Sequence, residues 1–116
     1  MKLFEKIKKL LNLFTENKKI INEIEDLKFQ NGCLFLENSL LKHSKNILDH
    51  EFKVFSQWGE DGIISYLINN LEIENNFFIE FGVENYLESN TRFLLKKFNW
   101  SGLIIDSSQK NIDYIK

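Results

Sequence analysis

Two residues that suit a nucleoside ligand follow two short apolar runs in the second half of the chain. The first run, residues 77–81, reads FFIEF and is followed by Gly82; the second, residues 103–105, reads LII and is followed by Asp106. We predict that both runs are strands of a parallel sheet and that the first is buried on both faces, because it is nearly continuous in apolar residues. Ligands of such sheets bind beyond the carboxyl ends of the strands.

The chemistry expected of these two positions differs. A glycine lets a ligand come close to the backbone, and an acid at the next strand end, about twenty residues on, can accept hydrogen bonds from both hydroxyls of a ribose. The pattern therefore fits a nucleoside site. It fits an ordinary turn with a glycine and a solvated aspartate equally well, and the spacing leaves both interpretations open.

Glu80 is an acid inside the first apolar run. A buried carboxylate is costly unless it is hydrogen-bonded or paired. We expect backbone amides of the following turn to satisfy it. Ser89 and Asn90 are expected to cap the next helix, and Arg92 is expected to be solvated.

The elements that must position these residues form one βαβ unit. Residues 90–98 have helical spacing, with Lys96 and Lys97 near the C-terminal end, where cations favour the helix dipole. The whole unit has about the thirty residues that a βαβ unit requires, and its crossover is expected to be right-handed, as such crossovers nearly always are. Before this unit, residues 56–63 read SQWGEDGI and lead into an amphipathic helix. Glu60 and Asp61 suit the N-terminus of that helix.

Three sequence blocks together resemble the FkbM-like group of S-adenosylmethionine-dependent methyltransferases. They are SQWGEDGI at residues 56–63, FIEFGVENYLESNTRFLL at residues 78–95 and WSGLIID at residues 100–106. The resemblance covers just over half of the chain and implies a Rossmann-like methyltransferase fold that binds S-adenosyl-L-methionine, with no metal. The cofactor-binding residues that it implies are Gln57, Asp61, Glu80, Gly82, Val83 and Asp106.

Within this resemblance, Glu80 and Gly82 match the first acidic and glycine positions of the cofactor motif. Asp106 matches the ribose-binding acid, and Gln57 and Asp61 are expected to hydrogen-bond the cofactor or to orient an acceptor hydroxyl. Residues 83–86 depart from the pattern, because many methyltransferases have further glycines there.

The implied activity is methyl transfer to a hydroxyl group of a sugar or another small molecule, with no catalytic base assigned. A nicotinamide-dinucleotide module on the same fold is one alternative. It lacks the G-x-G-x-x-G fingerprint after Phe81, and Glu84 would place negative charge beside a pyrophosphate. The other alternative is a truncated, catalytically inert interaction protein.

Length and composition limit these interpretations. The 116 residues are 43% hydrophobic, with 11 Phe and no Pro, which is enough for one small domain. Only ten residues follow Asp106, so we expect an incomplete α/β fold, either the front of a longer protein or a truncated one. The net charge of −2 gives no basic face for nucleic acid. Cys33, His43 and His50 have no zinc spacing, and a lone cysteine suits a reduced, cytoplasmic location.

The first fifty residues form an expected helical extension, and residues 51–116 form the N-terminal part of the methyltransferase domain. Residues 1–27 have apolar residues at alternating spacings of three and four, interrupted at Asn17. We expect this helix to pack on its own domain or on a second copy; contact with an anionic membrane surface through its lysines is a less favoured alternative. It has no signal-peptide or transmembrane pattern. A break is expected at Asn31 and Gly32, followed by a weaker helix over residues 33–48.

Overall fold

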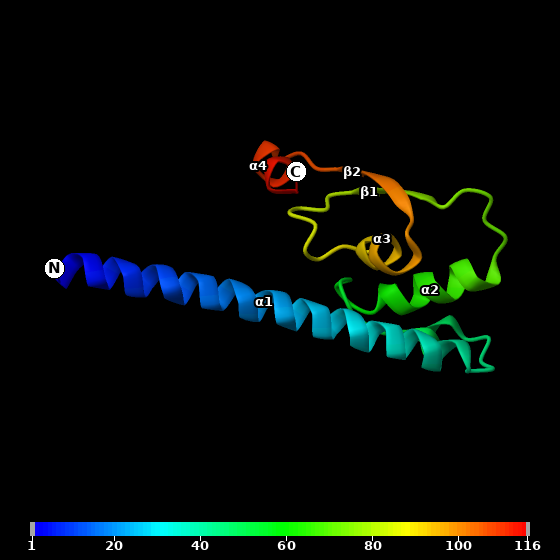
Figure 1. Cartoon of the computed structure of the whole chain (residues 1–116). Coiled ribbons are helices and arrows are strands. Elements are labelled where there is room, and N and C mark those ends of the chain that lie inside the picture. The colour runs from blue at the N-terminus through cyan, green and yellow to red at the C-terminus, as the bar shows by residue number, and fades with distance from the viewer. Residues whose placement is uncertain (1, 116) are drawn as a thin grey trace. The chain divides into compact units, whose positions relative to one another are not determined.

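The computed structural model describes residues 2–115 of the chain, which form a mixed α/β structure. In chain order the elements are α1 (Lys2–Leu40), the 3-10 helix η1 (Ile47–His50), α2 (Glu60–Asn70), β1 (Phe77–Phe81), α3 (Arg92–Phe98), β2 (Ser101–Ile105) and α4 (Gln109–Ile115) (Figure 1). They divide into two compact units, Met1–Gln30 and Asn31–Lys116. This division falls inside α1.

β1 and β2 pair in parallel, and α3 lies between them in the sequence. Their register sets Phe77 opposite Ser101 and Phe81 opposite Ile105. The predicted βαβ unit is therefore confirmed, although α3 begins two residues later than the pattern indicated and β2 begins two residues earlier. α4 starts soon after β2, at Gln109.

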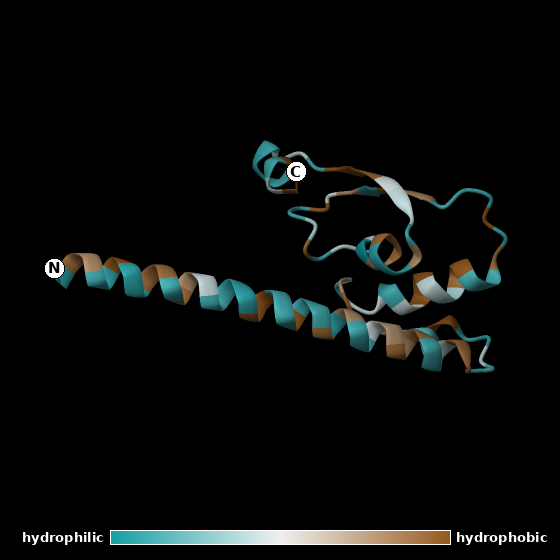
Figure 2. Cartoon of the chain, viewed as in Figure 1, coloured by the Kyte–Doolittle hydropathy of each residue, from teal (hydrophilic) through white to brown (hydrophobic). Residues whose placement is uncertain are grey.

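The prediction that the first strand, β1, is buried on both faces is wrong for the described chain. On one face Phe78 is buried. On the other face, Phe77, Ile79 and Phe81 of β1 are exposed, and so are Leu103 and Ile105 of β2. Figure 2 shows the apolar colour along β1. An apolar strand sequence indicates that burial of both faces is favourable. It does not indicate which residues pack against each face.

The core lies on the covered side and is rich in aromatic rings. The Phe93 ring meets the rings of Phe52 and Phe98 edge to face, with centroids 5.6 Å and 6.2 Å away. Phe35, from the C-terminal part of α1, packs on Phe52 at 6.1 Å. The buried apolar residues are Leu36, Val54, Phe55, Phe78, Val83, Phe93 and Leu94.

The predicted break at Asn31 and Gly32 is wrong, because α1 continues through both residues to Leu40. A Cβ atom at position 32 would lie 2.3 Å from Val54 Cγ2 and 3.1 Å from Phe93 Cε2. Glycine therefore stands here because the core approaches the helix backbone closely, and not because the chain turns. The predicted helix over residues 33–48 also ends early, at Leu40.

His50 stabilises the segment that follows α1. It is buried and stacks on Tyr66, with ring centroids 3.8 Å apart. Its Nε2 donates to Ser44 O at 2.9 Å, which leaves Nδ1 to accept from Ser39 Oγ at 2.8 Å. Cys33 is a half-buried free cysteine. No three His, Cys, Asp or Glu side chains of residues 2–115 gather as metal ligands.

The Gly32→Ala substitution should destabilise the protein. Helix propensity alone predicts a gain of about 1 kcal/mol from alanine, but the new methyl group must displace the stiff, fully buried Val54, and such overpacking costs about 1–3 kcal/mol. We expect a net loss of unfolding free energy in urea titrations. Asn22→Ala, on the exposed part of the same helix, is the control. A more stable Gly32→Ala protein would contradict the packing explanation.

Candidate functional site

The carboxyl ends of β1 and β2 meet at Gly82. Its N–H donates to Ile105 O at 2.8 Å, which continues the sheet pairing by one residue. Its φ angle is +69°, in the left-handed region that favours glycine. No atom lies within 4 Å of the position of a Cβ. The backbone at this strand end is therefore open to the approach of another molecule.

Asp106 joins the two strand ends through its carboxylate. Oδ2 accepts from the Glu84 amide at 2.8 Å, and Oδ1 accepts from the Ser108 amide at 2.8 Å and from Asn111 Nδ2 at 3.0 Å. The hydrogen bonds from Ser108, Asn111 and Glu84 lower the pKa of Asp106 below its ordinary value of 3.8. A carboxylate has about four acceptor positions. One position, on Oδ2, remains for a further donor.

Glu80 accepts a set of hydrogen bonds from the end of the loop between β1 and α3. Oε2 accepts from Ser89 Oγ at 2.8 Å, from the Thr91 amide at 3.1 Å and from Thr91 Oγ1, while among the described residues Oε1 accepts from the Asn90 amide, at 2.9 Å. The turn that follows the strand thus satisfies this carboxylate, as predicted. The expected capping role of Ser89 and Asn90 is wrong, since Thr91 is the N-cap residue and makes no side-chain cap bond.

Tyr86 extends this set of bonds. Its hydroxyl lies 3.0 Å from Thr91 Oγ1, which itself donates to Glu80, so the phenol must be the donor. Burial raises the pKa of Tyr86 above 10.0, and the nearby Glu80 carboxylate raises it further. The phenol therefore keeps its proton at neutral pH.

The loop between Gly82 and Thr91 holds two ordinary residues in left-handed conformations. Glu84 has φ 48° and Tyr86 has φ 63°. Non-glycine residues with positive φ cost on the order of 1 kcal/mol or more and are enriched at functional sites. Two sets of hydrogen bonds offset this cost. The Glu84 amide donates to Asp106, and the Tyr86 hydroxyl donates to Thr91 Oγ1, which in turn donates to Glu80.

A pocket of about 290 Å³ opens at this edge of the sheet. Glu80, Glu84 and Glu88 are three of its lining residues, and none of the described residues that line it is Lys or Arg. The pocket is therefore strongly acidic. The full lining is Gln57, Glu80, Phe81, Gly82, Glu84, Glu88, Ser89 and Asn90.

The structure brings together some of the six predicted cofactor-binding residues but not all of them. Gln57, Glu80 and Gly82 line the pocket, and Asp106 bonds to Glu84, which also lines it. Val83 is buried in the core and contributes no side chain to the lining. The sequence analysis used Glu84 only as an argument against a pyrophosphate and overlooked Glu88. Two acids within one short loop could have indicated an acidic pocket.

Asp61 lies outside this lining, at the N-terminus of α2. It is 1% exposed, and its Oδ2 accepts from the amides of Val54, Phe55 and Ser56 at 2.7–2.8 Å and from Ser56 Oγ at 2.8 Å. Among the described residues, its Oδ1 has no hydrogen-bond partner. In this structure Asp61 fixes the backbone of residues 54–56.

Glu60 has the helix-end role that the sequence predicted for both acids. Its Oε2 accepts from the amides of Trp58 and Gly59, each at 2.9 Å. Burial acts to raise the pKa of Glu60, but hydrogen bonds from its own amide and from these two neighbours outweigh it, so the pKa lies below 4.5. Together the two acids explain why SQWGEDGI forms a fixed turn before α2.

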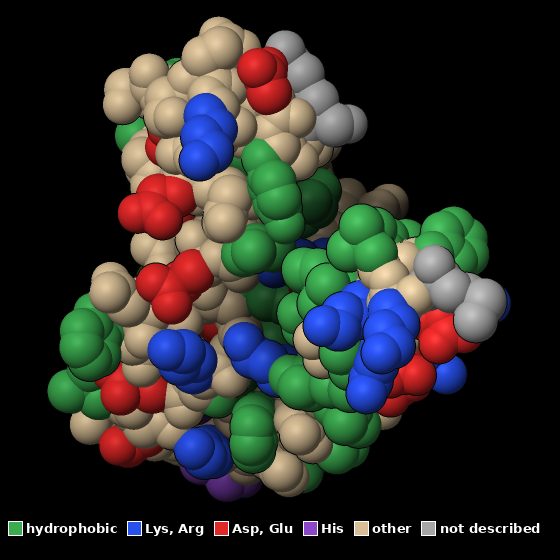
Figure 3. Space-filling view, turned by 90° about the vertical axis from the view of Figure 1, so that its left-hand side faces the viewer, with side chains coloured by type: hydrophobic (Ala, Val, Ile, Leu, Met, Phe, Trp, Pro, Cys, Tyr) green, Lys and Arg blue, Asp and Glu red, His purple; other side chains and the backbone are tan. Residues whose placement is uncertain are grey.

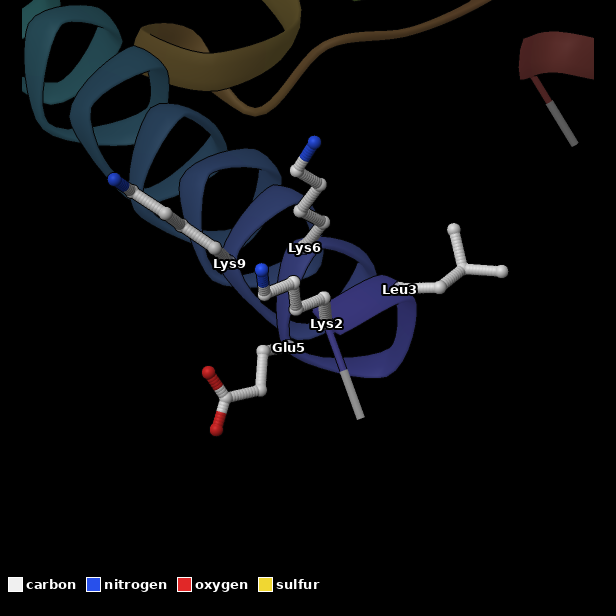
Figure 4. A pocket seen from close by; sticks show the side chains of 5 residues that line it. All are labelled: Lys2, Leu3, Glu5, Lys6 and Lys9. Atoms are coloured by element: carbon white, nitrogen blue, oxygen red, sulfur yellow. The ribbon is translucent and has the colours of Figure 1, made fainter.

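A larger hollow, of about 480 Å³, lies near the N-terminal end of α1. The described residues that line it all belong to the first turns of this one helix, and their labelled side chains point in different directions (Figure 4). They do not converge on a common point. This hollow is not a candidate site.

Comparisons with known proteins add no assignment. No family model matches the chain, no curated protein matches it and no solved structure matches it. Among residues 2–115, no helix combines the length and the apolar character needed to cross a bilayer. The resemblance to FkbM-like methyltransferases therefore stays a prediction from the three sequence blocks.

Asp61→Asn should destabilise the protein by about 2 kcal/mol or more, because four donors would lose their charged acceptor and three of them are backbone amides that cannot turn away. Urea unfolding measures the loss. Glu60→Gln, which removes charge from the half-buried neighbour, is the matched control and should stay within about 1 kcal/mol of the wild type. Equal effects of the two changes would contradict the role given to Asp61.

The Asp106 carboxyl group should titrate below pH 3.8 in the folded protein, and Asn111→Ala should move its pKa upward. A carboxyl whose folded pKa is lowered stabilises the fold above its unfolded pKa, and that contribution is lost as the pH falls through the folded pKa. NMR titration of the carboxyl carbon measures both values. An unchanged pKa in Asn111→Ala would show that the Nδ2 bond does not form in solution.

Proposed function

We propose that this chain is part of an S-adenosyl-L-methionine-dependent methyltransferase with an incomplete Rossmann-like fold. The observation that carries the proposal is the position of Glu80, Gly82 and Asp106 at the shared carboxyl edge of two parallel strands, beside an open acidic pocket. The resemblance of residues 56–106 to FkbM-like methyltransferases supports it. In that class these three positions hold the cofactor.

The charge of the pocket favours this cofactor. S-adenosyl-L-methionine carries a positive sulfonium and an ammonium group and has no phosphate. Glu80, Glu84 and Glu88 present carboxylates to the pocket, and opposite charges attract more strongly where water is partly excluded. A dinucleotide would instead place its pyrophosphate against these carboxylates, and none of the described residues that line the pocket is Lys or Arg. The acidic lining thus favours the methyl donor over a nicotinamide dinucleotide.

The residues present also fit the shape of the cofactor. Gly82 has empty space where a side chain would stand, so the ligand can lie against the backbone. The remaining acceptor position of Asp106, on Oδ2, suits a ribose hydroxyl, and Oε1 of Glu80, which accepts one bond, suits the ammonium group. Asp106 therefore receives one ribose hydroxyl in this geometry, whereas the sequence pattern predicted both.

Once bound, the sulfonium supplies an activated methyl group, so the protein mainly has to bind and orient the two reactants. Glu80 and Asp106 fix the loop that forms the pocket wall, and Gln57 lies on the same lining. We propose a hydroxyl of a sugar or another small molecule as the acceptor, from the family resemblance. No described residue is assigned as the catalytic base.

NMR titration of the isotope-labelled 116-residue chain tests the proposal, because it detects even millimolar binding. S-adenosyl-L-methionine should shift the amide signals of Gly82 and Glu84, and NAD should not. S-adenosylhomocysteine lacks the sulfonium charge and should bind more weakly, and Glu84→Gln should reduce this difference. An absence of shifts at these amides with millimolar S-adenosyl-L-methionine, or equal shifts with NAD, would overturn the assignment.

Asp106→Ala should weaken binding of S-adenosyl-L-methionine by about ten- to a hundredfold, since it removes one charge-assisted hydrogen bond and releases the Glu84 amide. The same titration measures the affinity. Glu72→Ala removes an exposed carboxylate before β1 and should leave the affinity unchanged. Equal affinities of the wild type and a folded Asp106→Ala protein would show that Asp106 does not bind the ribose.

A further inference from the structure

The part of α1 within Met1–Gln30 exposes a regular apolar seam. Successive members of the seam are separated by four and three residues in alternation, with Asn17 as its one polar member before Lys28. The exposed fractions of the apolar members are 72% for Leu3, 47% for Ile7, 55% for Leu10, 70% for Phe14, 62% for Ile21 and 51% for Ile24. Apolar and polar bands alternate along the helix in Figure 2, and hydrophobic side chains lie exposed among lysines at its N-terminal end in Figure 3.

This seam is large enough for a specific interface. It extends over more than three heptads, the length at which the pattern indicates a coiled coil. If each of the six apolar side chains buried about 100 Å², two helices would bury roughly 1,200 Å² together, the lower end of the range for specific interfaces. In proteins most of the stability of a helix comes from packing of its apolar face. The exposed seam therefore favours a partner along it.

The polar face argues against a lipid surface as that partner. Helices that lie on anionic membranes carry mainly Lys and Arg on this face. Here Glu5, Glu16, Glu23 and Asp26 lie opposite the seam together with Lys2, Lys8, Lys9 and Lys19, and Lys19 pairs with Glu23 at 3.9 Å. This face is therefore mixed in charge and not mainly basic. A mixed, exposed polar face is typical of the outer surface of a coiled coil.

We propose that α1 forms a parallel, in-register two-stranded coiled coil with α1 of a second copy of this chain. Asn17 decides the partner and the orientation. In the parallel arrangement each seam residue faces itself, so two Asn17 amides meet and can hydrogen-bond to each other. An antiparallel arrangement with the same seam sets Asn17 against Phe14, which leaves its amide without a partner.

Most of the remaining seam residues agree with two strands. In heptad notation Ile7, Phe14 and Ile21 occupy a positions, and Leu3, Leu10, Asn17 and Ile24 occupy d positions. Ile at a with Leu at d favours parallel dimers, and the pair of Asn17 amides is satisfied only when the two helices are parallel and in register. Lys28 is the next a position and ends the apolar seam.

Cysteine cross-linking tests orientation and register together. In a Cys33→Ser background, Leu10→Cys should form a disulfide-linked dimer with oxidised glutathione, because position 10 faces position 10 of the partner helix. Asn12→Cys, on the outer face of the same turn, is the matched control and should cross-link far less. In the antiparallel arrangement position 10 faces position 21, so Leu10→Cys alone would remain unlinked while Leu10→Cys with Ile21→Cys would link.

Sedimentation equilibrium of the otherwise unaltered chain tests the association itself. The wild type should have the mass of a dimer, and Ile7→Glu with Ile21→Glu should have the mass of a monomer, because both changes place charge in the seam. Asn17→Leu should raise the melting temperature and weaken the preference for the parallel orientation, because the pair of amides is lost. A monomeric wild type that binds anionic vesicles in a salt-sensitive way would overturn the proposal in favour of the membrane. None of these measurements depends on binding of S-adenosyl-L-methionine.

Discussion

One carboxylate oxygen, Oδ2 of Asp61, positions much of the second unit. It accepts from three consecutive amides and one hydroxyl, and thereby fixes residues 54–56 against the start of α2. From this fixed segment, Val54 packs against Gly32 of α1. The carbonyl of Phe55 accepts from the Ser89 amide at 3.0 Å, and Ser89 also donates to Glu80. A helix end, the core and one wall of the acidic pocket are thus connected through a single side chain.

The loop between Gly82 and Thr91 forms part of the pocket and is held by two further carboxylates, those of Asp106 and Glu80. Asp106 holds the beginning of the loop at Glu84, and Glu80 holds its end at residues 89–91. Asp106 follows β2 and Glu80 lies within β1, so the parallel register of the strands sets the distance between these two carboxylates. Sheet geometry and pocket geometry therefore change together, and a shift of β2 along β1 would open the loop.

The sequence predicted the local pattern well and the long-range packing poorly. The βαβ unit could be predicted because apolar spacing and turn residues act over a few positions. Gly32 was misread, since a glycine required by close packing has the same sequence appearance as one required by a turn. The exposed face of β1 could not be predicted, because the composition of a strand does not show which residues pack against each of its faces. The role of Asp61 depends on a turn that places three amides around one oxygen, which no periodicity reveals.

The left-handed conformations of Glu84 and Tyr86 have a consequence for motion. Because these residues favour other conformations when free, we expect the loop to have a lower free energy of local opening than the strands beside it. Amide hydrogens of the loop should then exchange with solvent faster than those of β1 and β2 that pair between the strands. The pocket wall would in that case open and close without unfolding of the sheet.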